Sequence, residues 1–278
     1  MQPWQFLPVH PELRQVIDTL LIMQVDDFSC LTVSSQFYHP WSAQTSMFLT
    51  LGEQVVKVKN YGENEFTTYP ANFVMGPNLV ERMVQCPNQH YVLGINFRPG
   101  ALYRFCGISI EELVNQVVEA SLIFGKAIDV LSQRIGAAKS KAEILNLVET
   151  FFFDKINKLG ALNTFDTAIA KLVQAEGNIP MDEVAKLACM SEKQFERKAL
   201  ERLGMLPKLF ARLTRFSKAY MIKETNPDIS WSNIAHQCGY YDQMHLVRDF
   251  KLFSGSTPTV AKQKIQNSIT AVTAFQNT

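Results

Sequence analysis

An internal repeat in the last hundred residues constrains the fold more than any other feature of this sequence. The segment from Pro180 to Pro207 matches the segment from Ser230 to Pro258 at six positions. The first two pairs are fifty residues apart, and the other four are fifty-one apart because one residue is inserted between them. The six pairs are Val184 with Ile234, Ala185 with Ala235, Phe195 with Leu246, Arg197 with Arg248, Gly204 with Gly255, and Pro207 with Pro258. This repetition predicts two copies of one supersecondary unit.

Each copy is typical of two helices joined by a tight turn. Such helices need a small residue where they touch, and Ala185 and Ala235 occupy that position. Their neighbours are expected to bury against a shared core. These apolar neighbours are Val184, Leu187, Phe195, Ile234 and Leu246.

The second helix of each copy has recognisable ends, which place it at about residues 191–203 and 242–253. Ser191 opens a capping box with Gln194, and Asp242 is a favourable N-cap. Gly204 and Gly255 are expected to end these helices because glycine accepts the left-handed conformation. Pro207 and Pro258 then prevent the helices from continuing.

The connector between the copies, Leu209–Glu224, contains no Gly or Pro and predicts a single helix. At a rise of about 1.5 Å per residue it would be about 24 Å long. A strut of this length can hold two recognition helices about 34 Å apart, so that both enter successive major grooves of one duplex.

Residues 165–264, which include both copies and the connector, resemble the DNA-binding domain of the AraC/XylS-type transcriptional regulators. The most specific stretch runs from Ile234-Ala235 through 239–251 to Gly255-Ser256-Thr257-Pro258. Cys189 departs from the pattern, since a turn glycine is frequent there, and Met244 stands where serine is frequent. The resemblance implies a regulator that binds double-stranded promoter or operator DNA, with RNA polymerase as a further candidate partner.

The N-terminal half predicts a different architecture. Short apolar or alternating runs punctuated by Gly and Pro indicate a β-rich region over residues 25–100, preceded by an early helix at Pro11–Gln24. Residues 109–155 are expected to be helical, beginning with a capping box from Ser109 to Glu112. The three expected helices lie near Ile110–Val118, Ile123–Ile135 and Lys141–Lys155. Through Phe97-Arg98-Pro99-Gly100, this half also resembles the cupin-like sensor domains of one branch of the same family.

The expected fold class is therefore α+β with two domains. A small β-barrel or cupin-like sensor domain with flanking helices, which could also dimerise, would occupy residues 1–156. A linker over 157–164 would lead to the all-α double helix-turn-helix domain at 165–266, and a flexible tail would follow at 267–278. Residues 1–160 hold 12 basic against 15 acidic residues, whereas 161–278 hold 15 against 11. This asymmetry fits a polyanionic partner for the second half, although random scatter of surface charge explains it equally well.

The candidate DNA-binding residues are those at the N-terminal halves of the two recognition helices, together with one basic residue further along the second helix. They are Lys193, Gln194, Glu196, Arg197, Lys198, Gln243, Met244, His245, Arg248 and Lys251. Arg197 is the best candidate for a bidentate contact to guanine, and Gln243 for a contact to adenine. Met244 would touch a thymine methyl group, and Lys251 would hold a phosphate.

Several of these residues have competing interpretations. Arg197 and Arg248 would be structural if they paired with acidic neighbours, and the candidate acids are Glu201, Asp182 and Asp249. His245 is better suited to packing or to a phosphate contact than to reading a base. Glu196 either accepts a hydrogen bond from cytosine or remains a solvated charge.

Other classes of protein fit less well. An enzymatic cupin needs His-x-His, which is absent, and no Gly-x-Ser-x-Gly nucleophile motif occurs. The five scattered cysteines include no C-x-x-C pair, so we expect a cytoplasmic protein with no metal and no cofactor. No secretory signal or membrane span is expected. The alternatives kept open are a protein-interaction scaffold without DNA affinity and, less favoured, a cupin-type enzyme fused to a DNA-binding domain. A small-molecule effector and a homodimer are expected possibilities, and the sequence identifies neither the effector nor its pocket.

Overall fold

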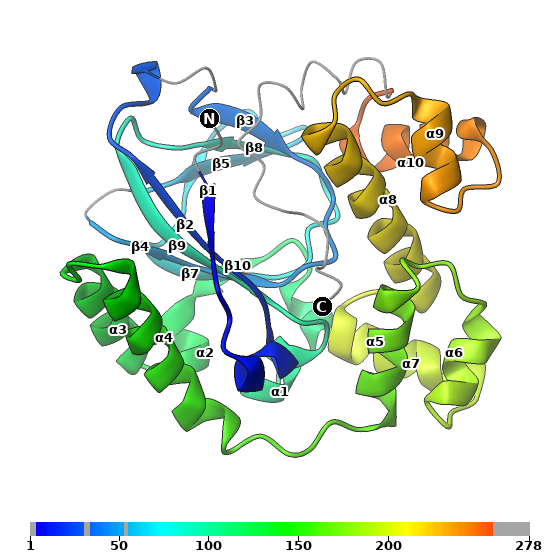
Figure 1. The fold of residues 1–278 in the computed structure, drawn as a ribbon, viewed down its shortest axis with the longest axis horizontal. Coiled ribbons are helices and arrows are strands. Elements are labelled where there is room, and N and C mark those ends of the chain that lie inside the picture. The colour runs from blue at the N-terminus through cyan, green and yellow to red at the C-terminus, as the bar shows by residue number, and fades with distance from the viewer. Residues whose placement is uncertain (1–3, 31–33, 53–54, 258–278) are drawn as a thin grey trace.

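The computed structural model describes residues 4–30, 34–52 and 55–257 (Figure 1). The predicted tail at 267–278 and Pro258 lie outside this range. The strands are β1 (Trp4–Leu7), β2 (Ile17–Val25), β3 (Gln36–His39), β4 (Ser46–Thr50), β5 (Lys57–Asn60), β6 (Thr67–Thr68), β7 (Asn72–Met75), β8 (Arg82–Gln85), β9 (His90–Phe97) and β10 (Val117–Glu119). The helices are α1 (Ala101–Cys106), α2 (Ala120–Phe124), α3 (Ala127–Gly136), α4 (Lys141–Ile156), α5 (Thr164–Gln174), α6 (Met181–Leu187), α7 (Glu192–Leu203), α8 (Pro207–Thr225), α9 (Trp231–Gln237) and α10 (Gln243–Ser254). Three short 3-10 helices complete the elements: η1 (Pro11–Gln15), η2 (Phe28–Cys30) and η3 (Ile110–Leu113).

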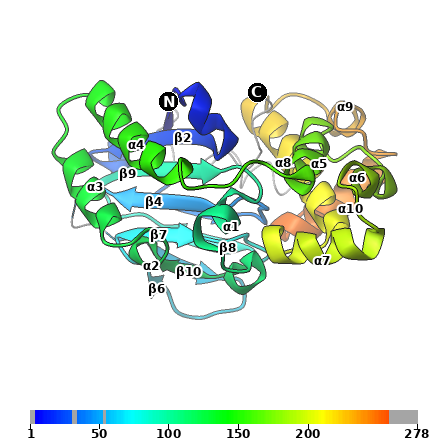
Figure 2. The same ribbon diagram turned by 90° about the horizontal axis from the view of Figure 1, so that it is seen from below.

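Two antiparallel sheets face each other in the N-terminal half, which confirms the predicted α+β class. The larger sheet has the strand order β1-β2-β9-β4-β7-β10, and the smaller has β3-β8-β5-β6. Figure 2 shows α2, α3 and α4 beside the strands, with the helices from α5 onward grouped at the other end of the molecule. None of the helices in the described ranges is long and apolar enough to cross a bilayer.

The prediction of a helix at Pro11–Gln24 is wrong. The chain forms only η1 there and then enters β2, so the β-rich region begins well before residue 25. The physical reason is that β2 is buried on both faces. Leu20 and Ile22 belong to the core that includes the helices, whereas Met23 and Val25 belong to the core between the sheets. A run that is apolar on both faces has no alternation, so its periodicity does not separate a strand from a buried helix.

The helix expected at Ile110–Val118 is also wrong, because the chain makes only the single turn η3 and then the strand β10. Ser109 does not cap this turn with its side chain. Its hydroxyl instead donates to the Glu201 carbonyl at 3.5 Å. Asn115 ends the turn with a left-handed φ of 60°, and its amide N–H donates to the Pro77 carbonyl at 2.8 Å. Long-range pairing of this kind overrides the local capping signal.

One buried histidine, His90, and one half-buried histidine, His39, are expected to make the N-terminal half sensitive to mild acid. Burial lowers the pKa of His39 and of His90 from 6.5 to about 4. As the pH falls from 7 to 5, the unfolded chain therefore takes up protons that the folded chain does not. The free energy of unfolding should fall by on the order of 1–2 kcal/mol for each histidine over this interval.

Urea unfolding at pH 7 and pH 5 measures this loss, with the double variant His39→Gln/His90→Gln as the control. The double variant retains all the carboxyl groups and should lose less stability than the wild type. Equal losses in both proteins would mean that the histidines are protonated in the folded state.

Candidate nucleic-acid interface

The first helix pair consists of α6 and α7. Val184 and Ala185 of α6 are buried against Phe195 of α7 in one core. Leu187, expected in that core, is 45% exposed because it lies on the outer face at the end of α6. The turn passes through Cys189 with a left-handed φ of 55°, the conformation that the family pattern assigns to glycine.

The second pair, α9 and α10, repeats this arrangement. Ile234, Ala235 and Leu246 are buried in the same core, which also contains Phe195 of the first pair. Gly239 occupies the turn position matching Cys189, with a φ of 70°. The predicted repeat therefore corresponds to two helix-turn-helix units that share one core, as expected for the predicted C-terminal all-α fold.

Both recognition helices begin and end as the sequence predicts. The Ser191 hydroxyl accepts from the Gln194 amide, and the Gln194 side chain accepts from the Ser191 amide at 3.0 Å, which completes a capping box. Asp242 caps α10 by accepting from the His245 amide at 2.7 Å. Gly204 and Gly255 end α7 and α10 with φ values of 74° and 63°.

The five candidates on α7 lie in its first two turns. Lys193, Gln194, Glu196 and Arg197 are exposed, and Lys198 is half-buried. Two of the five side chains are engaged within the protein. Gln194 belongs to the capping box, and Lys198 pairs with Glu201 at 2.8 Å. Lys193, Glu196 and Arg197 therefore form the accessible part of this face.

The five candidates on α10 are all exposed: Gln243, Met244, His245, Arg248 and Lys251. Met244 is 59% exposed, so its side chain is available for an apolar contact. His245 lies beside its own N-cap, with its Nδ1 atom 3.4 Å from Asp242 Oδ1. Tyr241, just before this helix, is 91% exposed and was not among the sequence candidates. Its only sequence signal is an aromatic residue next to an N-cap.

The three acidic residues named above as alternative partners of the two arginines are paired with other cations. Glu201 pairs with Lys198, Asp182 with Lys186, and Asp249 with Arg212. Within the described residues, neither Arg197 nor Arg248 forms a hydrogen bond or an ion pair. Both guanidinium groups are thus exposed cations on the outer faces of their helices.

Helix α8 joins the two units and is slightly longer than the predicted connector. Pro207 opens it, which is a favourable position for proline because the first amide N–H of a helix needs no partner. Its 19 residues give a length of about 28 Å. Figure 1 shows α8 running from the α5–α7 group to the α9–α10 pair. Arg215 donates to the Gly177 carbonyl between α5 and α6 at 2.8 Å, and Arg212 holds Asp249 of α10, so α8 is tied to both units.

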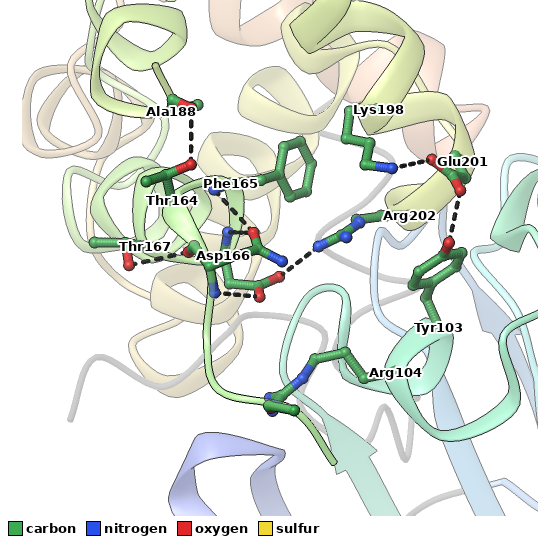
Figure 3. A network of polar contacts seen from close by, with 12 residues as sticks. Tyr103, Arg104, Thr164, Phe165, Asp166, Thr167, Ala188, Lys198, Glu201 and Arg202 are labelled. Carbon is green, nitrogen blue, oxygen red and sulfur yellow. Dashed lines mark hydrogen bonds and ion pairs between the residues drawn. The ribbon is translucent and has the colours of Figure 1, made fainter. Parts of the chain in front are cut away.

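The last turn of α7 contacts the N-terminal half (Figure 3). The Tyr103 hydroxyl of α1 donates to Glu201 at 2.6 Å. The Arg202 guanidinium lies over the Tyr103 ring and pairs with Asp166 at 3.2 Å. A Cβ atom on Gly204 would lie 2.9 Å from the Ile110 carbonyl oxygen, so glycine permits the close approach of η3.

The end of α10 makes a second contact with the N-terminal half. The Trp41 amide donates to the Phe253 carbonyl at 2.9 Å, and the two rings lie 5.4 Å apart. Both recognition helices therefore touch the N-terminal half through their C-terminal ends and leave their first turns free. Sequence reasoning missed these contacts because they join residues far apart in the chain.

Replacing Cys189 with glycine is expected to stabilise the protein. A non-glycine residue in the left-handed region costs about 1–2 kcal/mol, and the greater freedom of glycine in the unfolded chain offsets part of the gain. We expect a net gain of about 0.5–1 kcal/mol, measured by urea unfolding.

The opposite substitution at the matched turn, Gly239→Ala, provides the comparison. This substitution should destabilise the protein, because the new Cβ would lie 2.5 Å from Asn178 Oδ1 and alanine would have to adopt the positive φ of this position. Destabilisation by Cys189→Gly would contradict the interpretation that this turn is strained.

Comparisons with known proteins agree with this geometry. A family described as "Helix-turn-helix domain" matches residues 184–264, and one described as "Domain of unknown function (DUF6597)" matches residues 5–119. The comparison with curated protein sequences gave no match.

Solved structures provide the fold comparison. Apo ToxT from Vibrio cholerae strain SCE256, a point variant, aligns with a TM-score of 0.50 at 12% identity, over 88% of this chain and 97% of that chain. Wild-type ToxT of the same strain with a bound unsaturated fatty acid gives 0.46 at 13% identity, over 87% and 94%. The DNA-binding domain of AdpA in complex with a target DNA gives 0.35 at 22% identity, over 37% and 92%. At 12% identity the first alignment shows a shared fold over 88% of this chain.

Proposed function

We propose that this chain is a DNA-binding transcriptional regulator of the AraC/XylS type, which the helix-turn-helix family match over residues 184–264 and the fold shared with ToxT support. The two recognition helices, α7 and α10, enter successive major grooves on one face of a duplex. The N-terminal half responds to a small molecule or to a second subunit and changes how the two helices are presented.

The observation that carries this proposal is that the first turns of α7 and α10 are both exposed, while α8 joins the two helix pairs. About 28 Å of α8 is close to the roughly 34 Å that separates major grooves one turn apart. The free N–H groups and positive dipoles at the starts of α7 and α10 favour phosphate contacts. The cations Lys193, Arg197, Arg248 and Lys251 are exposed on the same two helices.

The side chains divide into readers and phosphate contacts. Arg197 is the guanine reader of α7, and Gln243 is the adenine reader of α10. Met244 contributes an apolar contact to a thymine methyl group, and Lys251 holds a phosphate. Gln194 and Lys198 act mainly within the protein, through the capping box and the pair with Glu201.

Control by the N-terminal half would act through the two contacts at the ends of α7 and α10. An effector changes DNA affinity only if it binds one arrangement of these contacts better than another. Homodimerisation would use the helices between Ser109 and Lys155. Leu122 and Val130 of this region are 73% and 55% exposed, which supports an apolar contact there. RNA polymerase is a further proposed partner.

The salt dependence of binding to a labelled 40-base-pair duplex of random sequence tests this function against the scaffold alternative. Phosphate contacts release counterions, so the affinity should fall steeply between 50 and 200 mM salt. The experiment requires only the purified full-length chain and fluorescence anisotropy. A protein-interaction scaffold would show no affinity for the duplex even at 50 mM salt, and that result would overturn the proposal.

A further inference from the structure

The second helix-turn-helix unit contains one residue more than the first, and the structure shows which residue it is. The amide of Met190 in the first unit and that of Tyr240 in the second both donate to the carbonyl of the alanine at the helix crossing, at 3.0 and 2.9 Å. Met190 and Tyr240 therefore occupy the same position in their turns. The next residue in the first unit is the N-cap Ser191, whereas the N-cap of α10 is Asp242. The inserted residue is therefore Tyr241.

The two adjacent tyrosines of the second turn differ in burial. Tyr240 is 7% exposed, its hydroxyl donates to Asp249 at 3.3 Å, and the Arg215 guanidinium lies over its ring. Tyr241 is 91% exposed, more than any other large apolar or aromatic residue in the described ranges. Turn positions usually hold small or polar residues such as glycine, asparagine or aspartate. Core packing therefore does not explain why the inserted residue is a tyrosine.

The Tyr241 ring lies beside the first turn of α10. It meets the imidazole ring of His245 edge to face, with ring centroids 6.2 Å apart and planes at 85°. The His245 Nδ1 atom is in turn 3.4 Å from Asp242 Oδ1, the oxygen that caps the helix. The Tyr241 hydroxyl has no hydrogen-bond partner among the described residues. It is therefore available to a group outside the protein.

The position of His245 shows which side of the recognition helix Tyr241 flanks. Leu246 is buried, and Met244 and Arg248 are exposed on the opposite face. At about 100° per residue, His245 lies between these two faces. When a recognition helix lies in a major groove, its outward face meets the bases, and its sides lie next to the sugar-phosphate backbone. Tyr241 is therefore placed beside one backbone of the groove that α10 would enter.

We propose, as an extension that rests on the proposed function, that Tyr241 binds the DNA sugar-phosphate backbone at this edge of the groove. The ring packs against a deoxyribose, and the hydroxyl donates to a non-bridging phosphate oxygen. A hydrogen bond to an ionised acceptor is stronger than one between two neutral groups. Sugar and phosphate are the same at every base pair, so this contact adds affinity without reading sequence.

The chain provides a matched control for an exposed tyrosine. Tyr61 is 81% exposed and lies in the turn that follows β5, in the N-terminal half. It flanks neither recognition helix. If Tyr241 were only a solvated turn residue, replacing it with alanine would have the same effect on DNA binding as Tyr61→Ala.

Fluorescence anisotropy of the full-length protein with specific and random duplexes tests the proposal. Tyr241→Phe removes only the hydroxyl and should weaken binding about threefold, whereas Tyr241→Ala removes the ring as well and should weaken it about tenfold. Both losses should be the same for the two duplexes. The slope of log affinity against log salt should not change, because a neutral side chain displaces no counterions from DNA. Tyr61→Ala should bind like the wild type.

Several outcomes would overturn this assignment. Tyr241→Ala could match Tyr61→Ala, or Tyr241→Phe could match the wild type, and either result excludes the backbone contact. A loss confined to the specific duplex would make Tyr241 a base reader. A changed salt slope would mean that Tyr241 acts through a cation such as Arg248. In all these cases the wild type still binds DNA, whereas a wild type without affinity at low salt would refute the proposed function itself.

Chemical protection gives a second measurement that needs no variant. Tetranitromethane nitrates accessible tyrosine rings, so Tyr241 and Tyr61 should both react in the free protein. Saturation with the random duplex should slow nitration of Tyr241 and leave that of Tyr61 unchanged, as measured by mass spectrometry of peptides. A nitration rate of Tyr241 that is the same with and without bound DNA would overturn the proposal.

Discussion

Replacing Arg197 with alanine is expected to weaken binding to the preferred DNA site by about 5- to 150-fold. This range corresponds to the roughly 1–3 kcal/mol of discrimination that a good bidentate contact to guanine provides. The side chain is exposed on α7, and its candidate acidic partners are paired elsewhere. Removing it should therefore affect recognition rather than folding. Fluorescence anisotropy on matched specific and random duplexes measures both affinities.

Lys171→Ala is the matched control for the loss of one positive charge. Lys171 is exposed on α5, where its ammonium group hydrogen-bonds Gln174 at 2.9 Å, and it lies outside the recognition helices. Its removal should cause a small change that is the same for specific and random duplexes. If the two variants behaved alike, Arg197 would be a general electrostatic contact and not a base reader.

Replacing Phe216 with alanine is expected to cost about 3–5 kcal/mol of stability, the largest effect that we predict for a single substitution. Phe216 of α8 is fully buried, and its ring lies 4.9 Å from that of Phe250 and 5.3 Å from that of Phe253. The cavity left behind would separate α10 from the connector. Hydrogen exchange of the amides of α8 and α10 should accelerate.

Phe216→Leu is the control, since it keeps most of the buried volume and should cost less, about 1–2 kcal/mol. The amides of β2 and β9 serve as an internal reference, because these strands lie in the N-terminal core and do not contact Phe216. Exchange that accelerated equally in β2 and α10 would show that the two halves unfold as one unit. Equal losses for alanine and leucine would contradict the packing explanation.

The C-terminal domain could be predicted from the sequence because its determinants are local. Ser191 and Asp242 cap their own helices by accepting from amides three residues further on. Gly204 and Gly255 end the same helices with positive φ. The buried alanines at the two helix crossings follow from the same repeat. In the N-terminal half the local rule applies where turn residues bound a strand, as in β7, which ends directly before Gly76 and Pro77.

The remaining features depend on contacts between distant residues. The sequence predicts a helix where β2 lies, because burial on both faces removes the period-two pattern. It also predicts a helix after Ser109, because nothing local shows that Asn115 pairs with Pro77. The division into domains at residues 157–164 and the base contacts themselves remain predictions.

The most direct test of the account is selection of binding sites from a random DNA pool by the full-length protein, repeated with Arg197→Ala and with Gln243→Ala. The account predicts a motif of two blocks separated by about one turn of duplex. Arg197→Ala should relax one block and Gln243→Ala the other. A motif with one block, two variants that relax the same block, or no motif at low salt would contradict a regulator that reads DNA with two helices.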